Sequence, residues 1–271
     1  MQQRTVMFVH AHPDDETTKA GGLAAALAAD GVRTVLVTCT DGSSGEVTDV
    51  ALLDGRSLAA VRSDELGRAA DIMGFAAVHE LGYLDSGIDS EVDDGFANLP
   101  LDAIVPRLVE LIELEAPSVI VTYDPAYAAS HPDHLQCHDI SASAFAETTE
   151  EPSGPQKLYG SRFWSKKRLQ AMHDWMAGRG GENPYAEALA KVGERPPDKF
   201  TTRIPIGDHA LTARNALKEH RTQIAHDNSW FYSIPDDAYA GLYPWAELEL
   251  LAPAFGTVPT PLESDIFSDV D

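Results

Sequence analysis

Apolar and polar residues follow one another in blocks along the first half of the chain. Three short apolar runs predict buried strands at 5–11, 33–42 and 118–124, and residues 78–83 predict a further short strand. The residues around them carry apolar positions at helical spacing and predict helices at 17–31, 56–74, 101–117 and 131–147. Strands that alternate with helices form βαβ units, so we expect a mostly parallel sheet.

The second half of the chain has a less regular pattern. Residues 157–164 predict a strand at the edge of the sheet, 201–206 another strand and 208–225 a helix. No linker divides the chain, so we predict one domain over residues 1–255, followed by an acidic tail at 256–271. The expected fold class is α/β, a Rossmann-like three-layer αβα sandwich with an irregular C-terminal part.

Composition limits the classes of binding partner that we expect for this chain. The formal net charge is −23, from 43 acidic and 20 basic residues, which argues against nucleic acid and against an anionic membrane surface. Two cysteines, Cys39 and Cys137, are too few for a disulfide framework. No apolar run has the length of a signal peptide core or a membrane span, so we expect a cytoplasmic protein.

A cluster of ionisable residues follows the first predicted strand. His10, His12, Asp14, Asp15 and Glu16 lie within seven residues, in "FVHAHPDDETT". Burying so many ionisable groups together is costly unless something compensates. In open α/β sheets, sites lie beyond the carboxyl ends of the strands, where this loop is expected. A metal ion is the compensation that we predict.

Two histidines and a carboxylate are a standard ligand set for catalytic zinc, which keeps one position open for water. His12 and Asp15 can supply two ligands, and either His131 or His134 of "HPDH" the third. Asp14 is then placed to act as general base. The remaining histidine can stabilise the oxyanion.

Each of these residues also has a simpler interpretation. Asp14 and Asp15 could cap a helix, "HPDH" could be a capped helix start, and His10 is best explained as structural. The occurrence of "HPDDE" after one strand and "HPDH" after another is much harder to explain in this way.

These motifs resemble a known family, the PIG-L (LmbE-like) zinc-dependent N-deacetylases. The resemblance rests on "AHPDDE" at 11–16 and "HPDH" at 131–134, and it covers at least residues 5–148. It implies that His12, Asp15 and His134 bind Zn²⁺, although other first-row divalent ions compete for such sites. It also implies that Asp14 is the general base and that His131 assists at the oxyanion or the leaving amine.

The family's mycothiol-pathway members suggest further substrate contacts. The matching positions in this chain are Glu46, Arg62 and Asp85. Close relatives in that pathway carry a tyrosine where this chain has Ala129, and Tyr127 is a candidate replacement.

The resemblance implies an enzyme, a metal-dependent hydrolase that removes an N-acetyl group from an N-acetylglucosamine-type amino sugar or glycoconjugate. The partner is thus a small molecule. Two alternatives stay open: a mycothiol S-conjugate amidase-like hydrolase, and a family member that binds metal without deacetylase activity.

Two other classes fit less well. The H-x-H-x-D-H motif of metallo-β-lactamase-like hydrolases is nearly met by His10, His12 and Asp14, but Asp15 stands where a histidine is required. A Rossmann-like binding protein would carry G-x-G-x-x-G after the first strand, and only "KAGGLAA" is present.

Overall fold

The computed structural model describes residues 4–128, 130–162, 164–193, 198–253 and 261–270. Within them, seven strands form one sheet in the order β3-β2-β1-β4-β5-β7-β6. The first five of these strands are parallel, and β7 runs antiparallel to both β5 and β6. The strands are β1 Thr5–His10, β2 Arg33–Thr40, β3 Ala77–Tyr83, β4 Val119–Tyr123, β5 Lys157–Ser161, β6 Thr202–Pro205 and β7 Trp245–Ala252.

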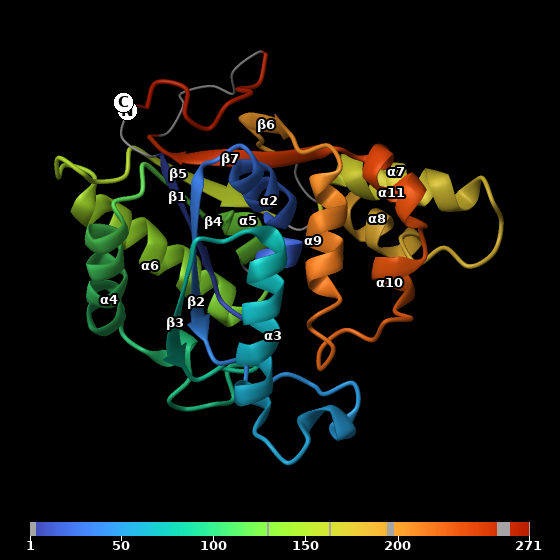
Figure 1. The fold of residues 1–271 in the computed structure, drawn as a ribbon, viewed down its shortest axis with the longest axis horizontal. Coiled ribbons are helices and arrows are strands. Elements are labelled where there is room, and N and C mark those ends of the chain that lie inside the picture. Colours follow the sequence, from blue (N-terminus) through green and yellow to red (C-terminus); the bar gives the residue numbers. More distant parts are fainter. Residues whose placement is uncertain (1–3, 129, 163, 194–197, 254–260, 271) are drawn as a thin grey trace.

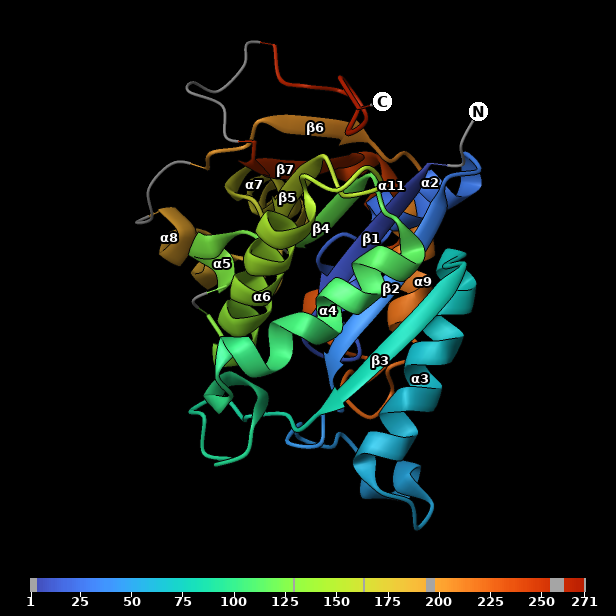
Figure 2. The same ribbon diagram turned by 90° about the vertical axis from the view of Figure 1, so that its left-hand side faces the viewer.

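Helices cover both faces of this sheet, which confirms the predicted α/β sandwich (Figure 1). Helices α4 and α6 lie on one face, and α2, α3 and α9 lie on the other (Figure 2). The helices are α1 Asp15–Thr18, α2 Gly21–Ala29, α3 Leu58–Met73, α4 Leu101–Glu115, α5 Pro125–Ala128, α6 Pro132–Thr148, α7 Lys166–Ala177, α8 Ala186–Gly193, α9 His209–Leu217, α10 Ser229–Tyr232 and α11 Asp236–Leu242. Short 3-10 helices span Val50–Leu53 and Phe96–Asn98.

The central strand β1 is buried on both faces. Met7 and Val9 pack toward α4 and α6, whereas Val6 and Phe8 pack toward α2, α3 and α9. Such burial explains the continuous apolar run in the sequence, because a strand covered on both sides needs no alternation. It also means that the loop after His10 begins deep inside the sandwich.

Three sequence-based expectations need correction. The helix predicted at 208–225 ends at Leu217, because the chain turns after it. Strand β5 ends at Ser161 and lies between β4 and β7, not at the edge of the sheet. The strand beside it, β7, was missed because Glu247 and Glu249 interrupt its apolar pattern. The helix predicted at 17–31 is divided into α1 and α2, because the chain bends at Lys19 and Ala20.

The far end of the chain packs on the sheet. Glu263 accepts hydrogen bonds from Lys157 and Tyr159, and Ile266 and Phe267 are buried. The described part of the expected acidic tail therefore belongs to the folded body, whereas the boundary at residue 255 falls outside the described residues and stays a prediction. No helix in the described ranges is both long and apolar enough to cross a membrane.

Candidate metal centre

The loop after β1 turns sharply at Asp14. This residue has φ 115° and ψ −26°, a region that residues other than glycine rarely adopt. The turn is closed by hydrogen bonds from the Asp15 amide to the His12 carbonyl (3.2 Å) and from the Thr17 amide to the Asp14 carbonyl (3.1 Å). A strained backbone beside a polar cluster is typical of functional sites.

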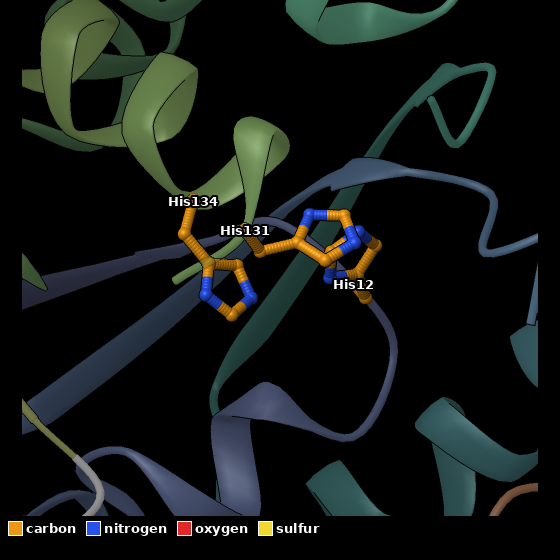
Figure 3. A group of neighbouring side chains, drawn as sticks. All are labelled: His12, His131 and His134. Atoms are coloured by element: carbon orange, nitrogen blue, oxygen red, sulfur yellow. The ribbon is translucent and has the colours of Figure 1, made fainter. Parts of the chain in front are cut away.

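The turn brings the predicted metal ligands to one point. Oδ2 of Asp15 lies 3.3 Å from Nδ1 of His12 and 3.3 Å from Nε2 of His134. Ring nitrogens of His12, His131 and His134 lie within 4.8 Å of one another, and Figure 3 shows the three side chains converging from the β1 loop and the start of α6. Thus the structure brings together all four residues that the two motifs suggested.

Asp133 holds the His12 ring in place. Its Oδ2 accepts a hydrogen bond from Nε2 of His12 (3.1 Å) and from the Ser86 amide (3.0 Å), while Oδ1 accepts from the Ala97 amide (3.1 Å). A carboxylate on the far nitrogen of a histidine is the usual support for a metal ligand. We did not predict this role from the sequence, although a carboxylate between the two histidines of "HPDH" was the available signal.

Tyr123 and Lys19 contact the carboxylate of Asp15, and neither residue was predicted from the sequence to belong to the site. The Tyr123 hydroxyl donates to Oδ2 of Asp15 (2.6 Å) and accepts from the Ala11 amide (2.7 Å). The Tyr123 ring also stacks on His134, with ring centroids 4.3 Å apart. Nζ of Lys19 lies 2.8 Å from Oδ1 of Asp15. Both oxygens of the carboxylate are therefore fixed.

The carboxylates around His12 favour a positive charge at this point. Burial lowers the pKa of His12, but hydrogen bonds to Asp133 and Asp15 outweigh burial and raise the pKa to about 10. Burial also raises the pKa of Asp15, yet Lys19 and His134 hold that pKa well below its ordinary value. A proton or a metal ion can supply the positive charge, because each balances the same carboxylates.

The donor set fits a divalent metal ion. Burial lowers the pKa of His134 to about 4, so its imidazole is neutral, the form that binds metals. Nδ1 of His134 has no hydrogen-bond partner among the described residues. Two imidazoles and one carboxylate match the ligands of catalytic zinc sites.

Asp14, the predicted base, lies beside this cluster. Its side chain is 23% exposed, and its Oδ2 accepts a hydrogen bond from Nη2 of Arg62 (3.1 Å). Burial raises the pKa of Asp14, against the lowering effect of the Arg62 charge. Arg62 also donates to the carbonyls of Gly42 (Nη1, 2.8 Å) and Pro13. The predicted substrate residue Arg62 is therefore buried behind the base and contacts it directly.

A second buried pair fixes the Asp14 turn from the C-terminal half. Oε2 of Glu16 accepts a hydrogen bond from the Asp14 amide (2.8 Å), and Oε1 lies 2.6 Å from Nε2 of His220. Next to it, the carboxylate of Glu65 accepts from the amide and hydroxyl of Thr222. His220 and Thr222 lie in the "HRTQI" segment that follows α9.

The other predicted substrate residues differ in position. Asp85 is buried, with Oδ1 3.7 Å from Nε2 of His12 and 3.0 Å from the Gly87 amide. Glu46 is exposed on the loop after β2. The half-buried Tyr127 ring faces His134, with centroids 6.0 Å apart, and Ala129 lies outside the described residues.

His10 has no place in the cluster. It is fully buried in β1, and burial lowers its pKa to about 4. Its ring packs edge-on against Tyr123 at 5.6 Å. Among the described residues, the groups able to hold a metal ion do not include it. This position agrees with a structural role.

Comparison with known proteins identifies the family. Residues 7–145 match the family model PIG-L, described as GlcNAc-PI de-N-acetylase. A mycothiol S-conjugate amidase from Streptomyces coelicolor is 32% identical over 99% of this chain and 98% of its own length. A 1D-myo-inositol 2-acetamido-2-deoxy-alpha-D-glucopyranoside deacetylase from Salinispora arenicola is 34% identical over 86% of this chain and 80% of its own length.

Solved structures show the same fold. The N,N'-diacetylchitobiose deacetylase from Pyrococcus horikoshii aligns with a TM-score of 0.64 at 19% identity, covering 92% of this chain and 84% of that one. The motif residues, their convergence and the extent of these matches agree with one another. The chain belongs to the PIG-L family of deacetylases.

Proposed function

We propose that this chain is a zinc-dependent N-deacetylase acting on an N-acetylglucosamine-type amino sugar or glycoconjugate. The observation that carries the proposal is the meeting of His12 and His134 at one oxygen of Asp15, 3.3 Å from each, with Asp14 alongside. Relatives named as deacetylases of an acetamido sugar support the substrate class.

His12, Asp15 and His134 would hold the zinc ion. A zinc ion in this position would make hydroxide available near neutral pH and would polarise the amide carbonyl. The protein contributes a buried, preoriented ligand set, because Asp133 fixes one histidine and Tyr123 fixes the carboxylate.

Asp14 would take the proton of the attacking water and return it to the leaving amine. Its Oδ2 accepts from Arg62, which leaves Oδ1 for the water. Burial raises its pKa, and a carboxylate with a raised pKa returns the proton more readily near neutral pH.

His131 would donate to the carbonyl oxygen as negative charge develops there. Its Nδ1 accepts a hydrogen bond from the Asp133 amide, so the neutral ring carries its proton on Nε2. Burial lowers the pKa of His131, which favours this neutral form. A positioned donor at a developing oxyanion is often the largest single contribution to catalysis. Tyr127 stays a candidate for a second donor.

The sugar would contact Asp85 and Glu46, one beside His12 and the other on the exposed rim. Arg62 would act mainly by holding Asp14, because only 3% of the residue is exposed. Its Nε is buried and has no hydrogen-bond partner within the described residues.

A second candidate is an amidase with a larger acyl group. The match to the mycothiol S-conjugate amidase, over 98% of that protein's length, favours it. Such an enzyme would break the same kind of amide bond, so the same residues would serve both reactions.

Acetate release from a panel of N-acetylglucosamine glycosides tests the proposal, with chelator and with zinc restored. We expect release that needs metal and that falls about 10²–10⁴-fold in Asp14→Asn, while bound zinc is unchanged. Asparagine tolerates positive φ, so the turn survives this change. Metal-independent release, or full activity of Asp14→Asn, would contradict the mechanism. Stoichiometric zinc without acetate release would favour the amidase or a metal-binding member without hydrolysis.

A further inference from the structure

A cavity lies next to the metal centre. It is formed by residues 17–23, by α9 and α11, and by β7, and it holds about 750 Å³ of empty space including its open mouth. Lys19 belongs to its wall and also contacts Asp15. The metal-site mechanism uses none of the other groups in the wall.

The charge of this cavity differs from that of the chain. The protein has 43 acidic and 20 basic residues, yet four cations line the cavity: Lys19, Arg162, Arg168 and Arg214. Among the described residues in the wall, Glu247 is the single carboxylate. A local excess of cations in a strongly acidic chain points to an anionic ligand.

Two of the four cations are already neutralised. Nζ of Lys19 lies 2.8 Å from Asp15, and Arg162 pairs with Asp124 (2.7 Å) and Asp198 (2.5 Å). A ligand that enters the cavity gains little from these two. The charge available to it comes from Arg168 and from Arg214, whose ion-pair partner Asp236 is more than half exposed.

Arg168 and Arg214 each have donor groups that the described residues do not satisfy with hydrogen bonds or well-aligned ion pairs. Arg168 donates to the Tyr239 hydroxyl (2.7 Å) and makes no ion pair with any carboxylate that the structure describes. Arg214 is only 5% exposed, and its Nη1 lies 3.1 Å from Asp236 without hydrogen-bond alignment. Nε of Arg214 has no partner at all among the described residues. A buried donor left unpaired is costly, and a ligand oxygen would remove that cost.

Glu247 offers the complementary acceptor. Its Oε1 accepts from Arg203 (2.5 Å), which balances its charge. Its Oε2 is buried and has no hydrogen-bond partner in the described structure. The wall thus presents unpaired donors and one unpaired acceptor.

Apart from Thr17, Thr18 and Ser165, the rest of the wall is apolar or aromatic. Phe231, Tyr239, Tyr243 and Trp245 line it together with small side chains of α2 and α9. Aromatic walls favour a flat apolar body in the ligand. An inorganic anion would leave these surfaces without contacts.

We propose that this cavity binds a small aromatic carboxylic acid that also carries a hydroxyl group. The carboxylate would bind Arg168 and Arg214, whose planar guanidinium groups match carboxylate geometry. The hydroxyl would donate to Oε2 of Glu247, and the ring would pack on the aromatic wall. The proposal is independent of the metal chemistry, because none of these contacts involves a metal ligand.

Calorimetric titration with 4-hydroxybenzoate tests the site directly. Its methyl ester removes the charge, and benzoate removes the hydroxyl donor. We expect one molecule bound per chain, with about ten-fold weaker binding of benzoate and of the ester. Arg168→Gln and Arg214→Lys are each expected to weaken binding of the acid about ten-fold. Arg107→Gln, an exposed arginine on α4, is the matched control and should bind normally.

Thermal unfolding of each variant checks that it is folded. If Arg214→Lys does not fold, Arg168→Gln still tests the site. Absence of binding heat, equal binding of acid and ester, or unchanged binding in both arginine variants would overturn the proposal.

A second arm, which rests on the proposed function, identifies the source of the acid. N-acetylglucosaminides with a 4-carboxyphenyl aglycone and with its methyl ester are compared. A lower KM for the acid, lost in Arg168→Gln, would support the site as the place where part of the substrate binds. Equal KM values with retained binding of 4-hydroxybenzoate would support it as the site of a separate ligand. The calorimetric result stands without activity, so failure of the deacetylase proposal is distinguishable from failure of this one.

Discussion

The metal centre and the arginine-lined cavity share Lys19 but are built differently. In the metal centre, the buried carboxylates of Asp15, Asp133 and Glu16 accept contacts from the protein on both oxygens. In the cavity, Nε of Arg214 and Oε2 of Glu247 have no partner within the described residues. The metal centre satisfies its carboxylates and leaves an imidazole nitrogen, Nδ1 of His134, without a partner in the described residues, whereas the cavity leaves a carboxylate oxygen and an arginine donor for a ligand.

The largest effect is expected from breaking the ligand set itself. His12→Ala should lower zinc affinity more than about 100-fold, because removal of a ligand costs more than removal of its support. His10→Ala is the matched control two residues away, and it should keep zinc while losing about 1–3 kcal/mol of unfolding free energy. Zinc content and chemical denaturation measure the two effects. Loss of zinc in His10→Ala would instead favour a ligand set that includes His10.

The second largest effect is expected from removing the carboxylate that holds His12. Asp133→Asn removes the negative charge beside the His12 ring and should weaken zinc binding about 10–100-fold. Competition with a chelator of known affinity measures this change. Asp71→Asn, an exposed position on α3, should have no effect. If zinc affinity is the same in both variants, Asp133 has only a structural role, in holding the loops that contain Ser86 and Ala97.

The smallest effect concerns the buried pair of His220 and Glu16. Burial lowers the pKa of His220, but the charges of Glu16 and Asp14 raise it above the ordinary value. A raised pKa means that the folded state holds the proton more tightly. The stability from this pair is therefore complete below about pH 6.5 and disappears as the pH rises through the raised value.

His220→Gln should reduce the unfolding free energy by about 1–3 kcal/mol at pH 6, with a smaller difference at higher pH. Chemical denaturation across this pH range measures it, and the exposed His226→Gln is the control. A difference that grows with pH would show that His220 is neutral in the folded protein.

Strong periodic signals made the first half of the chain predictable. The apolar runs of β1, β2 and β4 are buried on both faces, so composition alone identified them. Strand β7 could not be found in this way, because the two glutamates of "WAELELLA" interrupt its apolar run. Because β7 was not predicted, β5 was wrongly placed at the edge of the sheet.

The site followed the same division. The convergence of His12, Asp15 and His134 could be predicted because their motifs are local in sequence, and their role as ligands stays a prediction. His220 lies 204 residues from Glu16, so no spacing rule could pair them. The arginines of the cavity come from separate elements of the C-terminal half, and only the fold brings them together.

The backbone at Asp14 has a consequence for engineering. An aspartate at φ 115° strains the backbone, so the fold is less stable than it would be with glycine at the same position. Substitutions that relax the turn would be enriched by any selection for heat resistance alone, and Asp14→Gly would be among them. Such a selection would trade the proposed base for thermal tolerance, so libraries of this protein should be screened for hydrolysis as well as for survival on heating.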